Sequence, residues 1–174
     1  MSPAVAPVAE SAFAWPTGVR GAVSLTFDDS RPSQLEYGVP LFDRFAVRAT
    51  FYVVPAAVKK RRDAWRQAVA TGHEAGGHTI THPCTCNFSF SAAYGSNLEA
   101  MTLEQMETEL LESNAQIEAL VGVRPVSFAY PCGQKFVGRG EKLKSYVPLV
   151  ARHYLTGRGW RDEYFNAPDR CDLA

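Results

Sequence analysis

The sequence lacks an excess of charge of either sign. Its 174 residues contain 18 Lys and Arg and 18 Asp and Glu, so the formal net charge is zero at neutral pH. Nucleic-acid binders usually carry a basic excess or patch, and acidic membranes attract clustered positive charge. The basic run at residues 59–62 is interpreted as a solvated helix face. The composition therefore argues against nucleic acid or an acidic membrane as a partner.

Long apolar runs are also missing. No stretch approaches the roughly 18 apolar residues of a membrane span, and the longest, residues 51–58, is interrupted by Pro55. Residues 1–15 contain no Lys or Arg and so lack the charged start of a secretory signal peptide. Either the protein stays inside the cell or a leader is absent from this version of the sequence.

Cysteine is scarce. The four cysteines are Cys84, Cys86, Cys132 and Cys171, and their spacing is not the double Cys-x-x-Cys of a structural zinc site. An even number fits reduced thiols as well as bridged ones. The cysteine pattern therefore leaves the redox compartment open.

Short runs of β-branched and aromatic residues alternate with helical segments, which predicts an α/β fold with a largely parallel sheet or barrel. Residues 1–20 are expected to be an irregular lead-in, and residues 21–174 one domain. Residues 83–100 read as a long loop. The predicted strands are residues 22–27, 48–54, 74–80 and 126–130, and the predicted helices are residues 34–45, 56–71, 101–121 and 143–153.

Three of these strands end in residues that can carry chemistry. The first runs into Asp28 and Asp29, the third into His78 and His82, and the fourth into residues 130–133. Parallel α/β folds place their sites beyond the carboxyl ends of the strands. Two imidazoles and one carboxylate are three ligands that leave a position open, as in catalytic zinc sites. The alternative is that the two carboxylates only cap the following helix and that the two histidines only form hydrogen bonds. It explains each motif alone, but not their joint placement at strand ends.

A family resemblance rests on these same segments. Thr-Phe-Asp-Asp at residues 26–29 and Gly-His-Thr-Ile-Thr-His-Pro at residues 77–83 resemble the first two motifs of the polysaccharide deacetylases, carbohydrate esterase family 4. Phe-Ala-Tyr-Pro-Cys-Gly at residues 128–133 looks like a variant of the third motif. The resemblance covers about residues 20–135. It implies a distorted (β/α) barrel and the hydrolysis of N- or O-linked acetyl groups on a glycan.

The resemblance also implies roles for individual residues. Asp28 would be the general base for the attacking water. Asp29, His78 and His82 would hold one divalent metal ion, most simply Zn²⁺, which acts as a Lewis acid on the acetyl carbonyl. The backbone N–H of Cys132 would stabilise the oxyanion.

Tyr130 and Pro131 would line the sugar groove. The sequence also departs from the family pattern: position 30 is Ser where the family usually has Gly, and Cys132 replaces an aromatic residue. Ala129 stands where an Arg normally orients the base.

Two further family motifs are missing after residue 135: an Asp-Trp segment and a Leu-x-His whose imidazole protonates the leaving group. His153 is the only later histidine, and it falls inside a predicted helix. Arg124 is a nearby candidate to replace the missing Arg beside Asp28. We expect the chain to be the first part of a longer domain, partial at its C-terminus, that binds metal with weak or absent catalysis.

Two other functions stay open. One is a different substrate on the same scaffold, as in acetyl-xylan esterases or cyclic-amide hydrolases. The other is a glycan-binding module that keeps the metal without turnover. The family resemblance favours a secreted or cell-envelope protein. In that setting we expect a disulfide from Cys132 to Cys84 or Cys86, with thiolate ligation of a metal as the alternative.

Overall fold

The computed structural model describes residues 13–94, 97–160 and 166–167. The chain divides into two units. The first combines residues 1–23 and 163–172, and its described part contains a turn closed by the Val19 N–H on the Pro16 carbonyl and an edge-on contact of the Phe13 and Trp15 rings. The second is built on residues 24–162, which hold all the helices and strands named below.

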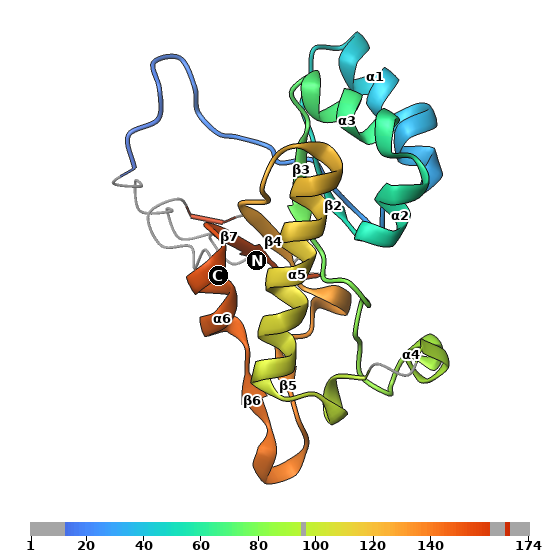
Figure 1. Ribbon diagram of the computed structural model, residues 1–174. Helices are drawn as coiled ribbons and strands as arrows, with labels where there is room; N and C mark the ends of the chain where they lie inside the picture. The colour runs from blue at the N-terminus through green and yellow to red at the C-terminus, as the bar shows by residue number, and fades with distance from the viewer. Residues whose placement is uncertain (1–12, 95–96, 161–165, 168–174) are drawn as a thin grey trace, which may run out of the picture. The chain divides into compact units, whose positions relative to one another are not determined.

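A five-stranded parallel sheet organises the second unit (Figure 1). Its order is β1-β2-β3-β4-β7. The strands are β1 (Thr26–Asp28), β2 (Thr50–Val53), β3 (Glu74–Gly77), β4 (Ser127–Ala129) and β7 (Thr156–Arg158). The first four confirm the predicted strands, in shorter form. Within the described residues β1 and β7 are the two edges and do not pair, so the sheet is open rather than a closed barrel.

Helices pack on one face of this sheet. The helical elements are η1 (Gln34–Gly38), α1 (Val39–Arg44), α2 (Pro55–Lys60), α3 (Arg62–Ala70), α5 (Leu103–Val121) and α6 (Val147–His153). Strand side chains alternate between faces, and Phe51 and Phe128 point into the helical layer, where both are buried. One core cluster centres on Phe51 and Trp65, and the other on Phe128 and Tyr146.

Helix α5 connects the two clusters because its buried residues reach both. Met106 and Leu110 belong to one cluster and Ile117 to the other. Its N-terminus forms a capping box between Thr102 and Gln105, and Gly122 adopts the left-handed conformation that ends it.

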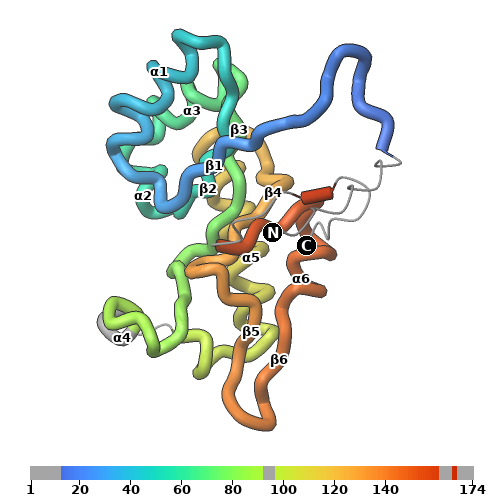
Figure 2. Tube along the Cα trace, turned by 180° about the vertical axis from the view of Figure 1, so that it is seen from behind, coloured from blue at the N-terminus to red at the C-terminus, as the bar shows by residue number. Residues whose placement is uncertain are grey.

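The segments around the predicted loop differ from expectation. Residues 83–100 contain α4 (Ser89–Tyr94) and η2 (Leu98–Ala100). The predicted helix at 56–71 is two helices, because the backbone leaves helical geometry at Arg61. The predicted helix at 143–153 begins only at Val147. Before it, β6 (Lys144–Ser145) pairs antiparallel with β5 (Phe136–Val137). Figure 2 shows this hairpin at the same end of the unit as α4.

No helix in the described part of the chain is long and apolar enough to cross a membrane.

Candidate active site

The carboxyl ends of β1 and β3 bring three ligand groups together. Asp29 Oδ1 lies 3.6 Å from His78 Nε2 and 3.4 Å from His82 Nε2. These ligand atoms all lie within 4.8 Å of one another. The sequence predicted this grouping, and the structure assembles it from residues 49 to 53 positions apart because β1 and β3 both flank β2.

The turn after β1 holds Asp29 in an uncommon backbone conformation. Asp29 and Ser30 have φ values of 74° and 53°, a region that costs a non-glycine residue about 1–3 kcal/mol. Two contacts hold the turn: the Ser30 hydroxyl accepts the Val54 N–H at 2.9 Å, and the Gln34 amide donates to the Asp28 carbonyl. The Ser at position 30 is therefore a structural tie from this turn to the start of α2.

Neighbouring groups hold the ring of His78 and the backbone of His82. His78 is buried, and its Nδ1 lies 2.8 Å from the Ala129 carbonyl on β4, which leaves Nε2 facing Asp29. The contact of His78 Nδ1 is of the kind that fixes the ring orientation of metal-binding histidines. The Thr79 hydroxyl accepts the backbone N–H of His82 at 3.0 Å, which holds the turn that carries His82.

Glu109 on α5 holds the turn between the two histidines. Its carboxylate accepts the N–H groups of Ile80 and Thr81, at 2.8 and 3.0 Å, and the Thr81 hydroxyl at 2.9 Å. Sequence reasoning missed this residue because nothing local links position 109 to position 80.

The electrostatics favour a charged Asp29 carboxylate and a neutral His82 ring. A hydrogen bond from His78 lowers the pKa of Asp29 well below its usual range, and the charges of His78 and His82 add to this against the opposing effect of burial. Burial, and then the nearby His78, lower the pKa of His82 from its ordinary 6.5. A carboxylate with two neutral imidazoles is the protonation state that metal binding requires.

The donor set therefore fits a divalent metal ion. It supplies one oxygen and two nitrogens, with His78 already tied to a backbone carbonyl on its other ring nitrogen. Imidazole and carboxylate ligands suit several first-row ions.

Asp28 lies beside the cluster of Asp29, His78 and His82 and is paired with Arg158. The Arg158 guanidinium donates to Asp28 Oδ1, and its charge also lies 5.0 Å from the centre of the Tyr52 ring. Arg158 is the β7 residue in register with Ala129 on β4. The guanidinium that contacts Asp28 thus comes from the strand adjacent to Ala129. The candidate Arg124 instead pairs with Glu118 at 3.7 Å.

Strand β7 escaped prediction because Thr-Gly-Arg carries no apolar run. The available signal was the basic residue Arg158 after a predicted helix, at the place where another β-strand of an α/β pattern is due.

A disulfide joins the second and third motifs. Cys84 and Cys132 are bonded, which confirms one of the two pairings expected for Cys132. Cys86 is free and exposed, and Cys171 lies outside the described residues. Cys84 and Cys132 also lie near His82, with Cys84 Sγ 3.6 Å from His82 Nδ1. Because these two sulfurs are bonded to each other, neither is a thiolate. In this structure they therefore do not act as thiolate ligands of a metal.

The remaining predicted site residues are Tyr130, Pro131 and Cys132, which directly follow β4. Cys132 has a φ of 55° in the short turn after β4. Tyr130 and Pro131 are buried, and Tyr130, at 2 % exposure, packs against Phe128 and Tyr146. Tyr130 thus offers little surface to a ligand in this structure, and its role in sugar binding stays a prediction.

The two histidines outside the cluster have structural contacts. His73 is buried and accepts the Ala49 N–H. His153 lies 2.8 Å from Glu107.

Comparisons with known proteins identify the relatives of this chain. The family model described as polysaccharide deacetylase matches residues 16–145. A gellan lyase from a Bacillus species is 29% identical over 145 residues, which are 83% of this chain and 5% of that protein. A chitooligosaccharide deacetylase from Sinorhizobium fredii is 34% identical over 97 residues, which are 55% of this chain and 39% of that protein.

Solved structures show the same fold. A family 4 carbohydrate esterase from Streptomyces lividans, in complex with acetate, superposes with a TM-score of 0.60 at 21% identity. The match covers 80% of this chain and 62% of the esterase. The distorted barrel type expected from the sequence is thus confirmed, in a form shorter than its neighbours. Because the family model matches residues 16–145, which are most of this chain, the chain belongs to the polysaccharide deacetylase family.

Proposed function

We propose that the protein is a metal-dependent hydrolase that removes N- or O-linked acetyl groups from a glycan. The observation that carries this proposal is the pairing of Asp28 with Arg158 directly beside the cluster of Asp29, His78 and His82. Asp28 and Asp29 are adjacent, so a base lies directly beside the metal site. Hydrolysis of an acetyl group needs both. Family membership supports the reaction class, and chitooligosaccharide deacetylases are among the relatives.

Each residue has a distinct task in this reaction. Bound by Asp29, His78 and His82, a divalent ion, most simply Zn²⁺, supplies Lewis-acid polarisation of the acetyl carbonyl. Asp28 accepts the proton of the attacking water, and Arg158 orients its carboxylate. The Cys132 N–H donates to the negative oxygen that develops on the carbonyl.

Protonation of the leaving group is expected to be the slow step of this reaction. The chain contains four histidines, and all are described. Two belong to the metal cluster, His73 is in the core, and His153 contacts Glu107. No imidazole is left in this chain to act as the general acid, so we expect slow acetate release with an intact metal site.

The lack of an imidazole for the general acid favours a glycan-binding module as the second candidate function. The Arg158 contact weighs against it, because a binding module has no need of an oriented base. The disulfide between Cys84 and Cys132 supports placing either candidate in an oxidising compartment, such as the cell envelope or the exterior.

The test measures acetate release from N-acetylated chitooligosaccharides and O-acetylated xylan by the Zn²⁺-loaded chain and by Asp28→Asn. We expect release by the wild type and loss of it in the variant, with one metal ion per chain in both. Metal binding and glycan binding without any acetate release would replace the hydrolase with the binding module.

A further inference from the structure

His82 lies between two groups of metal-binding side chains and faces each with a different ring nitrogen. Its Nε2 is 3.4 Å from Asp29 Oδ1, within the Asp29 cluster formed by Asp29, His78 and His82. Its Nδ1 is 3.6 Å from Cys84 Sγ. One ligand atom each from His82, Cys84 and Cys132 forms a second group, and these atoms also lie within 4.8 Å of one another. The proposed function uses only the Asp29 cluster.

The disulfide prevents the second group from binding a metal in this structure. Cys84 and Cys132 are bonded to each other, whereas the thiolate is the form of cysteine that binds metals. A bonded sulfur carries no hydrogen, so a hydrogen bond between His82 and Cys84 requires the hydrogen on Nδ1. A neutral imidazole has one donor and one acceptor nitrogen. The lone pair of the ring then belongs to Nε2, which faces the Asp29 cluster.

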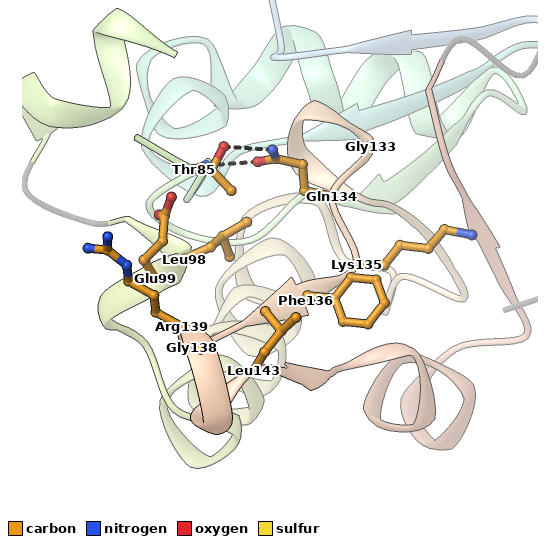
Figure 3. A pocket seen from close by; sticks show the side chains of 11 residues that line it. Thr85, Leu98, Glu99, Gly133, Gln134, Lys135, Phe136, Gly138, Arg139 and Leu143 are labelled. Atoms are coloured by element: carbon orange, nitrogen blue, oxygen red, sulfur yellow. Dashed lines mark hydrogen bonds between the residues drawn. The ribbon is translucent and has the colours of Figure 1, made fainter. Parts of the chain in front are cut away.

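Hydrogen bonds hold the two cysteine segments together independently of the disulfide. Gln134 donates to the Thr85 hydroxyl at 2.7 Å and accepts the Thr85 N–H at 2.8 Å, as Figure 3 shows. Thr85 directly follows Cys84, and Gln134 is two residues after Cys132. The Cys84 carbonyl also accepts the Ser91 hydroxyl at 2.7 Å. The two sulfurs therefore stay close to each other, and to His82, when the bond between them is broken.

A dithiol reductant opens this bond from the Cys132 side. Cys132 is partly exposed, whereas Cys84 is buried. The attacking thiolate bonds to Cys132 Sγ, the S–S bond breaks, and its electron pair passes to Cys84 Sγ beside His82. The second thiol of the reductant then displaces Cys132. The protein disulfide has gained two electrons and two protons, and the reductant has become a disulfide.

The reduced pair and His82 form a ligand set of two sulfurs and one nitrogen. Thiolates select Zn²⁺ and other soft ions more strongly than a carboxylate does, and two cysteines with one histidine occur in zinc sites that keep an open position. Binding of the ion releases the two thiol protons. When Nδ1 of His82 is the ligand, Nε2 carries the ring hydrogen and is lost to the Asp29 cluster.

We propose that reduction of the disulfide between Cys84 and Cys132 opens a second metal site, the sulfur site, formed by these two sulfurs and His82 Nδ1. It takes Zn²⁺ or another thiophilic ion. Because the sulfur site and the Asp29 cluster share His82, they hold one ion between them, and reduction moves that ion to the sulfurs. This competition rests on the metal site of the proposed function, whereas the sulfur site itself does not.

The test uses Co²⁺ as the probe, because Co²⁺ bound to thiolate has a charge-transfer absorption that oxygen and imidazole ligands do not produce. The chain carries Cys86→Ser and Cys171→Ser, so Cys84 and Cys132 are its only cysteines. It is titrated in the oxidised form and again after reduction by a dithiol that is then removed without air. We expect one Co²⁺ per chain in both forms, with the thiolate absorption in the reduced form alone.

Variants of this chain separate the two sites. Cys132→Ser loses the thiolate absorption, and His82→Ala weakens Co²⁺ binding by the reduced chain at least about tenfold. His78→Ala binds no Co²⁺ when oxidised but shows the thiolate absorption when reduced, because His78 belongs to the Asp29 cluster alone. His153→Ala is the matched control and behaves as the parent chain, since His153 contacts Glu107.

A reduced chain without thiolate absorption, or with two Co²⁺ ions, overturns the inference. Loss of the folded circular dichroism spectrum on reduction, before any metal is added, also overturns it, because the two segments would then depend on the disulfide. The proposed function is judged separately. An oxidised chain that binds Co²⁺ but releases no acetate removes the hydrolase and leaves this inference standing.

Discussion

Arg158 donates to the carboxylate of Asp28 across 130 residues of sequence. The two side chains come from β7 and β1, the opposite edges of the sheet as described. Arg158 occupies the position in register with Ala129, so its guanidinium reaches Asp28 from the strand beside the one where the family has its arginine.

Arg158→Ala is expected to lower acetate release about 10–100-fold, as loss of a supporting contact typically does. Zn²⁺ affinity stays unchanged, because Arg158 contacts the base and not the metal ligands. Arg124→Ala is the control, since Arg124 pairs with Glu118. Equal losses in the two variants would contradict the assignment.

His78→Ala and His82→Ala are each expected to abolish the binding of one Zn²⁺ per chain. Each removes one of three ligands that lie within 4.8 Å of one another. Metal content after dialysis measures this, with His153→Ala as the control because His153 contacts Glu107 instead. Retention of the ion by His78→Ala and His82→Ala would place the metal elsewhere.

Glu109→Ala is expected to weaken Zn²⁺ binding about 10–100-fold. The variant removes three hydrogen bonds from the turn at residues 80–81, between the two histidines, but no ligand. Titration with a zinc indicator measures the affinity, and Glu112→Ala one turn along α5 is the exposed control. Unchanged affinity would show that the turn holds its shape without Glu109.

Protonation of His82 is expected to weaken Zn²⁺ binding only below the ordinary His pKa of 6.5. Burial and His78 lower the pKa of His82, so this ligand stays neutral until the pH drops through that lowered value. Protons then compete with the metal. Affinity measured between about pH 8 and pH 5 tests this. Protonation of the His82 ring at or above pH 6.5, followed by its NMR signals, would mean that its pKa is not lowered.

Cys84→Ser with Cys132→Ser is expected to lower the free energy of unfolding by roughly 2–4 kcal/mol. The bond closes a loop between residues 48 positions apart, which restricts the unfolded chain. Denaturant unfolding measures the difference. A reductant destabilises the wild type in the same way, and Cys86→Ser, which removes the free thiol, leaves stability unchanged. No effect of reductant would mean that the disulfide is absent in solution.

The sequence by itself determined the grouping of Asp29, His78 and His82. Asp29 follows β1 directly, and His78 and His82 follow β3, so local strand patterns and the parallel topology were enough to bring them together. Helix α5 was equally predictable, because the capping box at Thr102 and the glycine at position 122 are local signals.

Only the tertiary structure decided the groups that support the cluster. Arg158 reaches Asp28 through strand register, Glu109 reaches the turn at residues 80–81 from α5, and Cys132 is bonded to Cys84 rather than Cys86. Each contact joins segments that are distant along the chain. Their distance is set by how strands and helices pack, and no local periodicity encodes it.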